Sequence, residues 1–299
     1  MERARVRAHN AARLRGGLYL IQYENSAGET IRLDRAGFYA EEETLRDFVW
    51  DYNYSGYPDG TGGSVSLFSR HEKTKSFSVS AHAYSRNEIE ALLNRLHNIT
   101  EYDVRNREPG KLWLNSQYIS CYVIGSEITA KSKHMLFVTK KLTVLPVIPY
   151  WCMEDTKQFA AGSASSASPY GKRYNGRYAY KYGTGYSQTM LDNTVGSWET
   201  PMILTIYGPV INPSLSIGGH TYALNTTLAA NERAVIDQLH KKIYKVGTTG
   251  NKSNLFNTRD KTNDIFQFAP VGMVAVLYNG DYAFDITLIH QRSEPLWNN

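Results

Sequence analysis

Apolar and polar residues alternate in short runs along most of this chain, and clusters of turn-forming residues separate the runs. The clearest run is 75–84, in which Phe77, Val79, Ala81 and Ala83 alternate with serines and a histidine. A period of two places one set of side chains on one face, so the run predicts a half-buried antiparallel strand. Tyrosine is over-used, with 22 of 299 residues, and there are 23 glycines. These residues favour strands and turns, so we expect a fold made mainly of β-sheet.

One segment has helical periodicity instead. Ser85 and Glu88 form an S-x-x-E capping pattern, and apolar residues then recur at helical spacing: Ile89, Leu92, Leu93, Leu96 and Ile99. The pattern predicts one amphipathic helix over residues 86–98. We expect Leu92 and Leu96 to be buried against the N-terminal sheet or against a neighbouring subunit.

Turn signals divide the N-terminal half into further elements. We expect a hairpin over 18–35, a loop over 51–63, a strand over 65–70, a second hairpin over 111–125 and a long strand over 134–148. Glycine and proline in 51–63 are the reason for predicting a loop there. Cys121 and Cys152 are predicted to be small buried hydrophobic residues.

The C-terminal part contains about eight short strands with turns every 8–12 residues, which predicts a β-sandwich. Residues 233–246 fit two strands slightly better than a short helix. Residues 264–268, 273–278 and 282–289 are predicted to be three more strands. Asn279-Gly280 between the last two is a strong hairpin signal.

Composition also divides the chain into three regions, 1–154, 155–199 and 200–299. The middle region is rich in Gly, Ser and Tyr, and its residues 157–190 carry five basic side chains and no acid. Such a stretch is either a flexible linker or a long excursion that becomes ordered on a partner. We predict an arm that is ordered only against a neighbouring subunit or another protein. Tyr178, Tyr182 and Trp198 are its candidate interface residues.

Charge and composition exclude several protein classes. The formal net charge is +5, a smaller excess than is usual in a dedicated nucleic-acid-binding protein. No apolar run is long enough for a transmembrane helix, and the first 17 residues are too polar for a signal peptide. Two cysteines cannot form a disulfide scaffold, which indicates a protein made in a reducing cytoplasm.

No catalytic, cofactor-binding or metal-binding motif occurs in the sequence. The eight histidines do not have a known metal-ligand spacing, and the hydrolase, zincin and nucleotide-binding motifs are missing. A glycosidase with two carboxylates stays open, because such acids need only meet in space. Of the five tryptophans, Trp113 and Trp151 are predicted in the core, whereas Trp198 and Trp297 are predicted to be exposed or at an interface.

Three stretches of the C-terminal third carry a family resemblance: 198–228 with its Asn212-Pro213 turn, 232–256 with Asp237 and Gly250, and 264–278 with Pro270 and Gly272. Their order, together with the helix and the hairpin over 110–123, resembles the distal tail protein family of long-tailed phages. The Arg-rich N-terminus and residues 157–190 depart from the family pattern.

The resemblance implies an all-β fold with one helix, comprising an N-terminal ring-forming domain and a galectin-like C-terminal sandwich. It implies a hexameric ring of this chain that continues the tail tube at the tail tip and encloses a channel through which DNA passes. The implied partners are the tail tube protein, a tail hub protein and, as a further candidate, a receptor-binding protein. The protein would be assembled in the host cytoplasm, reside in the virion and not insert into membranes. The alternative is a carbohydrate-binding sandwich used in host adhesion.

Overall fold

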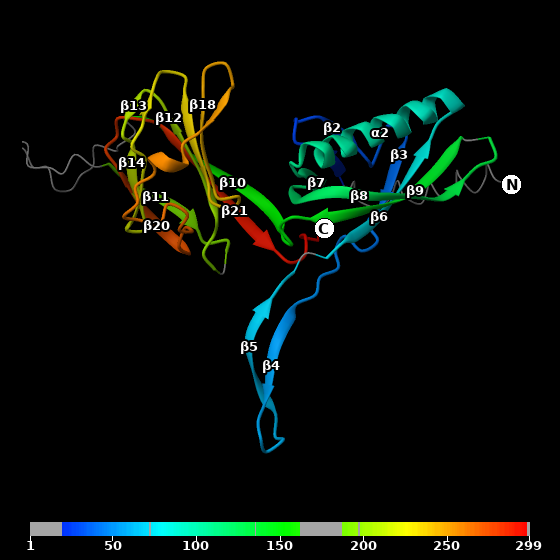
Figure 1. Cartoon of the computed structure of the whole chain (residues 1–299), viewed down its shortest axis with the longest axis horizontal. Coiled ribbons are helices and arrows are strands. Elements are labelled where there is room, and N and C mark those ends of the chain that lie inside the picture. The colour runs from blue at the N-terminus through cyan, green and yellow to red at the C-terminus, as the bar shows by residue number, and fades with distance from the viewer. Residues whose placement is uncertain (1–19, 72, 135, 162–186, 197, 298–299) are drawn as a thin grey trace, which may run out of the picture. The chain divides into compact units, whose positions relative to one another are not determined.

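The computed structural model describes residues 20–71, 73–134, 136–161, 187–196 and 198–297. Within these ranges the chain is mostly antiparallel sheet with one α-helix, as the sequence predicts (Figure 1). It divides into two compact units, 1–152 with 292–299 and 153–291. The sequence boundaries place 292–297 in the second domain, whereas the contacts of these residues group them with the first unit. None of the helices in the described part is long and apolar enough to cross a membrane.

The first unit is built around one long strand, β8. Its elements are β1 (Ile21–Glu24), β2 (Thr30–Arg32), β3 (Phe38–Glu41), β4 (Asp51–Gly56), β5 (Gly63–Ser69), β6 (Lys75–His82), α2 (Arg86–Asn106), β7 (Gly110–Leu114), β8 (Gln117–Lys131) and β9 (Phe137–Pro146). The first half of β8 pairs with β7, which leads to β1 and β2, and its second half pairs with β9, which leads to β6 and β3. The predicted hairpins over 18–35 and 111–125 are both present.

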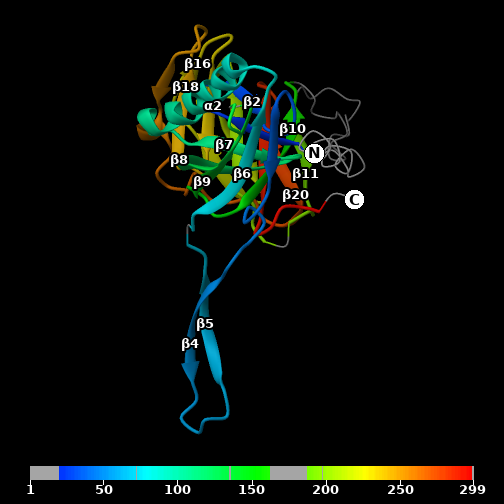
Figure 2. The same ribbon diagram turned by 90° about the vertical axis from the view of Figure 1, so that its right-hand side faces the viewer.

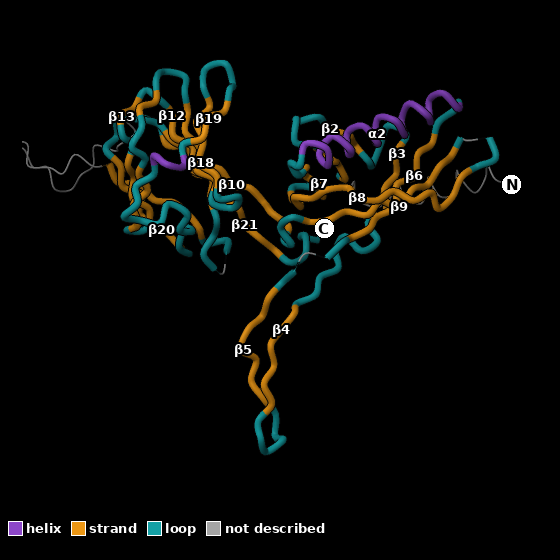
Figure 3. Tube along the Cα trace, viewed as in Figure 1, coloured by secondary structure: helices purple, strands orange, loops and turns teal. Residues whose placement is uncertain are grey.

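Helix α2 packs on this sheet (Figure 3). Ser85 and Glu88 form the predicted capping box. The helix ends at Asn106, not at residue 98, because Thr100 and Asp103 continue its buried face as polar residues that an apolar pattern does not detect. Gly37 allows the close approach, since a Cβ there would lie 2.9 Å from the Leu92 Cδ1 atom.

A buried carboxylate joins the helix to the first hairpin. Asp103 is fully buried, and its Oδ2 accepts a hydrogen bond of 2.6 Å from the Tyr23 hydroxyl. Its Oδ1 accepts bonds of 2.7 Å from both the backbone N–H and the hydroxyl of Ser26. Burial, with contributions from Cys121 and Asp103, raises the pKa of the Tyr23 hydroxyl, so this hydroxyl stays protonated and donates. The network ties the end of α2 to the turn between β1 and β2.

The second unit is a β-sandwich. It contains β10 (Trp151–Phe159) from residue 153 onward, β11 (Ser187–Asn193), β12 (Met202–Tyr207), β13 (Val210–Ile211), β14 (Ser214–Ile217), β15 (His220–Ala223), β16 (Thr227–Leu228), β17 (Arg233–Asp237), β18 (Lys242–Val246), β19 (Lys252–Asn254), the 3-10 turn η1 (Phe256–Thr258), β20 (Gly272–Tyr278) and β21 (Phe284–Arg292) up to residue 291. One sheet has the order β19-β18-β17-β12-β21-β10, and the other has the order β11-β20-β14-β15. Their inner side chains form one core.

One strand prediction and one hairpin prediction for this unit are wrong. Residues 264–268 form a turn and irregular chain, because the Asp264 carboxylate accepts from the Phe266 N–H and closes a local turn. The turn at Asn279-Gly280 is present, yet β20 and β21 pair with strands of different sheets. The dipeptide therefore carries the chain from one layer of the sandwich to the other rather than closing a hairpin.

Candidate assembly surface

The segment between β3 and β6 forms a hairpin that projects from the first unit (Figures 1 and 2). Strands β4 and β5 pair only with each other among the described strands. The prediction of a loop over 51–63 is therefore wrong for residues 51–56, which form β4. Tyr52 and Tyr54 alternate with polar residues there, and this alternation is typical of a strand. The loop was predicted instead because of the glycine and proline residues in 51–63.

A bulge gives the hairpin one apolar face. Tyr52 lies opposite Phe68, and Tyr54 lies opposite Val65, with the register shift between Asn53 and Tyr54. Directly opposed residues share a face, and Tyr52 and Tyr54 share one through the strand period of two. The shift thus gathers Tyr52, Tyr54, Val65 and Phe68 on the same face. Tyr52 is 63% exposed and Phe68 is 61% exposed.

The tip of the hairpin is closed by its own hydrogen bonds. The Asp59 carboxylate accepts from the Thr61 N–H at 3.1 Å and from the Thr61 hydroxyl at 2.8 Å, and these bonds lower its pKa. Gly63 is required near the tip, since a Cβ there would lie 2.3 Å from the backbone oxygen of Ser55 on the opposite strand. The hairpin thus has a defined turn and a defined apolar face, and none of the described strands pairs with it.

The root of the hairpin is polar and buried. Lys75, at the start of β6, is 7% exposed and donates to the carbonyl oxygens of Leu45 at 3.0 Å, Thr44 at 3.4 Å and Asp47. Burial, with the nearby charge of Arg70, lowers the pKa of the Lys75 ammonium to about 8. Through its three hydrogen bonds to carbonyl oxygens, Lys75 holds the segment that leads into β4.

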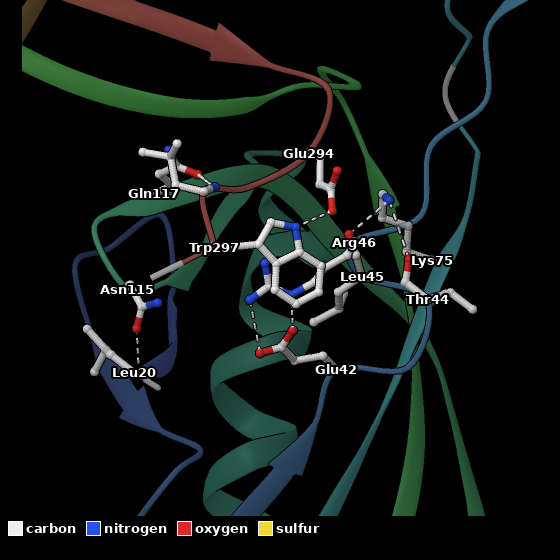
Figure 4. Close-up of polar contacts among 11 residues, drawn as sticks. Leu20, Glu42, Thr44, Leu45, Arg46, Lys75, Asn115, Gln117, Glu294 and Trp297 are labelled. Atoms are coloured by element: carbon white, nitrogen blue, oxygen red, sulfur yellow. Dashed lines mark hydrogen bonds and ion pairs between the residues drawn. The ribbon is translucent and has the colours of Figure 1, made fainter. Parts of the chain in front are cut away.

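The C-terminal residues lie at the same root (Figure 4). The Trp297 ring lies 4.0 Å from the Arg46 guanidinium carbon, and Arg46 also pairs with Glu42. The Trp297 indole N–H donates to Glu294 at 2.7 Å. These tail residues therefore pack on the segment that precedes β4.

The five candidate residues from the sequence do not form one site. Leu96 is buried in the core of the first unit, and Leu92 is partly buried over the same core. Trp198 belongs to the second unit and is 58% exposed. Tyr178 and Tyr182 lie outside the described residues. Their role as interface residues stays a prediction, and the hairpin face is the candidate surface that the sequence prediction missed.

The other tryptophans and the cysteines follow the burial expected of them in most cases. Trp151 is 1% exposed, and Cys121 and Cys152 are fully buried. Trp113 is only half-buried, because its indole N–H donates to Glu24 at 2.8 Å near the surface. Trp297 is 64% exposed. The described residues contain no group of three or more His, Cys, Asp or Glu placed to hold a metal ion.

Comparisons with known proteins address the fold. No protein-family model matches the chain, and no curated protein matches it by sequence. Solved structures do match. A chain of the activated phage P2 baseplate with Ca has a TM-score of 0.63 at 11% identity, covering 93% of this chain and 99% of that one. The chain has the fold of a phage baseplate hub protein.

Two further structures agree with this hub fold. The same baseplate with Sr gives a TM-score of 0.63 at 11% identity, over 93% of this chain and 100% of that one. The Dit protein of phage SPP1 has a TM-score of 0.52 at 9% identity, covering 92% of this chain and 99% of that one. It is described as a paradigm of the hub adsorption apparatus in phages that infect Gram-positive bacteria. The hub fold thus includes both units of the chain, not one of them alone.

Proposed function

We propose that this chain is a structural subunit of the tail tip of a long-tailed phage. The observation that carries the proposal is the fold agreement over 93% of this chain and 99% of a baseplate chain. A likeness over both units supports a shared architecture of the whole protein, because a single β-sandwich occurs in many unrelated proteins.

We further propose that the subunits form a hexameric ring and that the hairpin β4–β5 supplies a contact between neighbours. An isolated two-stranded hairpin is marginal in water. This hairpin in addition exposes large apolar side chains that include Tyr52, Tyr54, Leu67 and Phe68. Covering one such side chain contributes about 1.5–3 kcal/mol. A second copy of the chain is the occupant that a symmetric ring provides for every hairpin at once.

Three phenylalanines of the second unit favour this structural role over sugar binding. A sugar stacks on an open ring face. The Arg259 guanidinium lies 4.0 Å from the centre of the Phe256 ring, and Lys241 lies 5.0 Å from that of Phe266 and 5.2 Å from that of Phe268. Cations of the same chain therefore occupy these faces.

The other partners follow from the ring. We propose that one face of the ring continues the tail tube and that the opposite face meets a tail hub protein. The second unit, which faces outward in this proposal, anchors a receptor-binding protein. DNA is in contact with the ring only during passage through its channel.

The test removes the apolar face of the hairpin and measures assembly. Tyr52→Ser combined with Phe68→Ser reduces the face without touching the core of either unit. Tyr102→Ser is the matched control, because Tyr102 is 44% exposed on α2 of the same unit. Light scattering of the full chain gives the mass, and circular dichroism gives the melting temperature.

The proposal predicts that the hairpin double variant loses the oligomer and keeps the wild-type melting temperature of the subunit. The Tyr102→Ser variant is expected to assemble as the wild type does. Equal assembly of all three proteins would overturn the role of the hairpin in the ring.

A further inference from the structure

The hairpin β4–β5 joins the body of the first unit through two legs. The first leg is the segment 42–50 before β4, and the second begins at Arg70 directly after β5. A rigid hairpin needs both legs held, because its own strands pair only with each other among the described strands. The residues that hold the legs therefore determine the direction of the hairpin.

The C-terminal tail, residues 293–297, contacts both legs. On the first leg, the Trp297 ring packs 4.0 Å from the Arg46 guanidinium carbon, where Arg46 is 9% exposed. On the second leg, the Arg70 guanidinium donates to the Ser293 carbonyl oxygen at 3.1 Å. The two ends of the same five-residue segment thus bind the two legs.

Both contacts are oriented by further partners. Glu42 pairs with the Arg46 guanidinium that Trp297 covers, and Glu294 accepts from the Trp297 indole (Figure 4). Arg70 lies 5.0 Å from the centre of the Tyr150 ring, and burial lowers the pKa of its guanidinium. An arginine held between an acid and an aromatic face has little freedom to turn away.

The tail is itself anchored in the body of the first unit. The Leu296 N–H donates to the side-chain oxygen of Gln117 at 2.9 Å, and Gln117 is 2% exposed at the start of β8. Pro295 is buried. The tail follows directly after β21, the last strand in the chain. It therefore connects β8 and both hairpin legs in one short segment.

We propose that residues 293–297 are a clamp that holds the root of hairpin β4–β5 in its assembly-competent direction, with Trp297 and Arg70 as its positioning residues. The importance of that direction for the ring rests on the proposed function of the hairpin. The clamp itself is a property of the single subunit.

The experiment is hydrogen–deuterium exchange on the full chain carrying Trp297→Ala. Trp198→Ala is the matched control, since Trp297 is 64% exposed and Trp198 is 58% exposed, and only Trp297 stacks on a hairpin leg. Loss of the stacking contact is expected to speed exchange in both legs about three- to tenfold. Exchange in α2 and β7 is expected to stay unchanged. Trp297→Phe keeps a ring over Arg46 and is expected to give an intermediate effect.

Exchange and assembly are then compared. Faster leg exchange in Trp297→Ala in a chain that never assembles would support the clamp and contradict the ring. Unchanged leg exchange in Trp297→Ala in a chain that does assemble would overturn the clamp and leave the ring intact. Equal acceleration in Trp297→Ala and Trp198→Ala would also overturn the clamp, because it would indicate general loosening.

Discussion

Replacing Asp103 by alanine tests whether the buried carboxylate holds the first unit together. The change removes the acceptor for the Tyr23 hydroxyl at 2.6 Å and for the Ser26 N–H at 2.7 Å. Each buried donor left without a partner costs about 1–3 kcal/mol. The Ser26 hydroxyl is half-buried and can turn to solvent, so the two remaining donors give an expected total loss of about 2–6 kcal/mol.

That loss is large enough to measure. A unit of this size loses about 2–4 °C for each kcal/mol, so we expect its melting temperature to fall by about 4–24 °C. Tryptophan fluorescence follows this unit selectively, because four of the five tryptophans, Trp50, Trp113, Trp151 and Trp297, belong to it. Using the transition of one unit avoids treating the two-unit chain as a single cooperative system.

Asp59→Ala is the matched control for this prediction. Asp59 also accepts a backbone N–H and a hydroxyl, both from Thr61, but it lies exposed at the hairpin tip. Surface changes of this kind usually alter stability by less than about 0.5 kcal/mol. An Asp103→Ala variant that melted at the same temperature as Asp59→Ala would refute the argument that the carboxylate ties α2 to the first hairpin.

Two further predictions concern close packing and pH. Gly110→Ala would place a Cβ 2.4 Å from the Asp103 Oδ2 atom, so we expect a strongly lowered melting temperature, whereas Gly56→Ala, with its nearest neighbour at 3.8 Å, is expected to melt as the wild type does. His290 is buried with no hydrogen-bond partner for its ring among the described residues, and burial lowers its pKa below 6.5. The unfolded chain then binds the proton more readily, so the second unit keeps its stability above pH 6.5 and loses it as the pH falls towards the folded pKa. Urea unfolding midpoints of the second unit at pH values above and below 6.5 measure this loss of stability. His134→Gln, at an exposed histidine, is the control. A pH dependence of the midpoint that persisted in His290→Gln but vanished in His134→Gln would contradict the role of His290.

Local patterns in the sequence predict most of the fold. The alternation over 75–84 and the capping box at Ser85 depend on neighbours in the chain, and β6 and the start of α2 lie where these signals put them. The end of α2 could not be predicted in the same way. Asp103 is buried because the Tyr23 hydroxyl, 80 residues away in the chain, donates to it, and no local pattern shows such a partner.

The candidate surface was harder to predict for two physical reasons. The apolar face of the hairpin depends on a bulge at Asn53 and Tyr54, which no short motif reveals. The clamp depends on the return of residues 293–297 to the first unit, a contact across 223 residues between Arg70 and Ser293. Trp297 was expected to be exposed or at an interface, and the residue is 64% exposed. Its stacking partner Arg46 could be found only from the structure.

Native mass spectrometry of the full chain at tens of micromolar tests the central claim most directly. The account predicts a complex with six times the chain mass of 33.8 kDa, and a chain without residues 51–69 that stays monomeric. A folded full chain that is monomeric under the same conditions, or a complex that survives deletion of the hairpin, would contradict it.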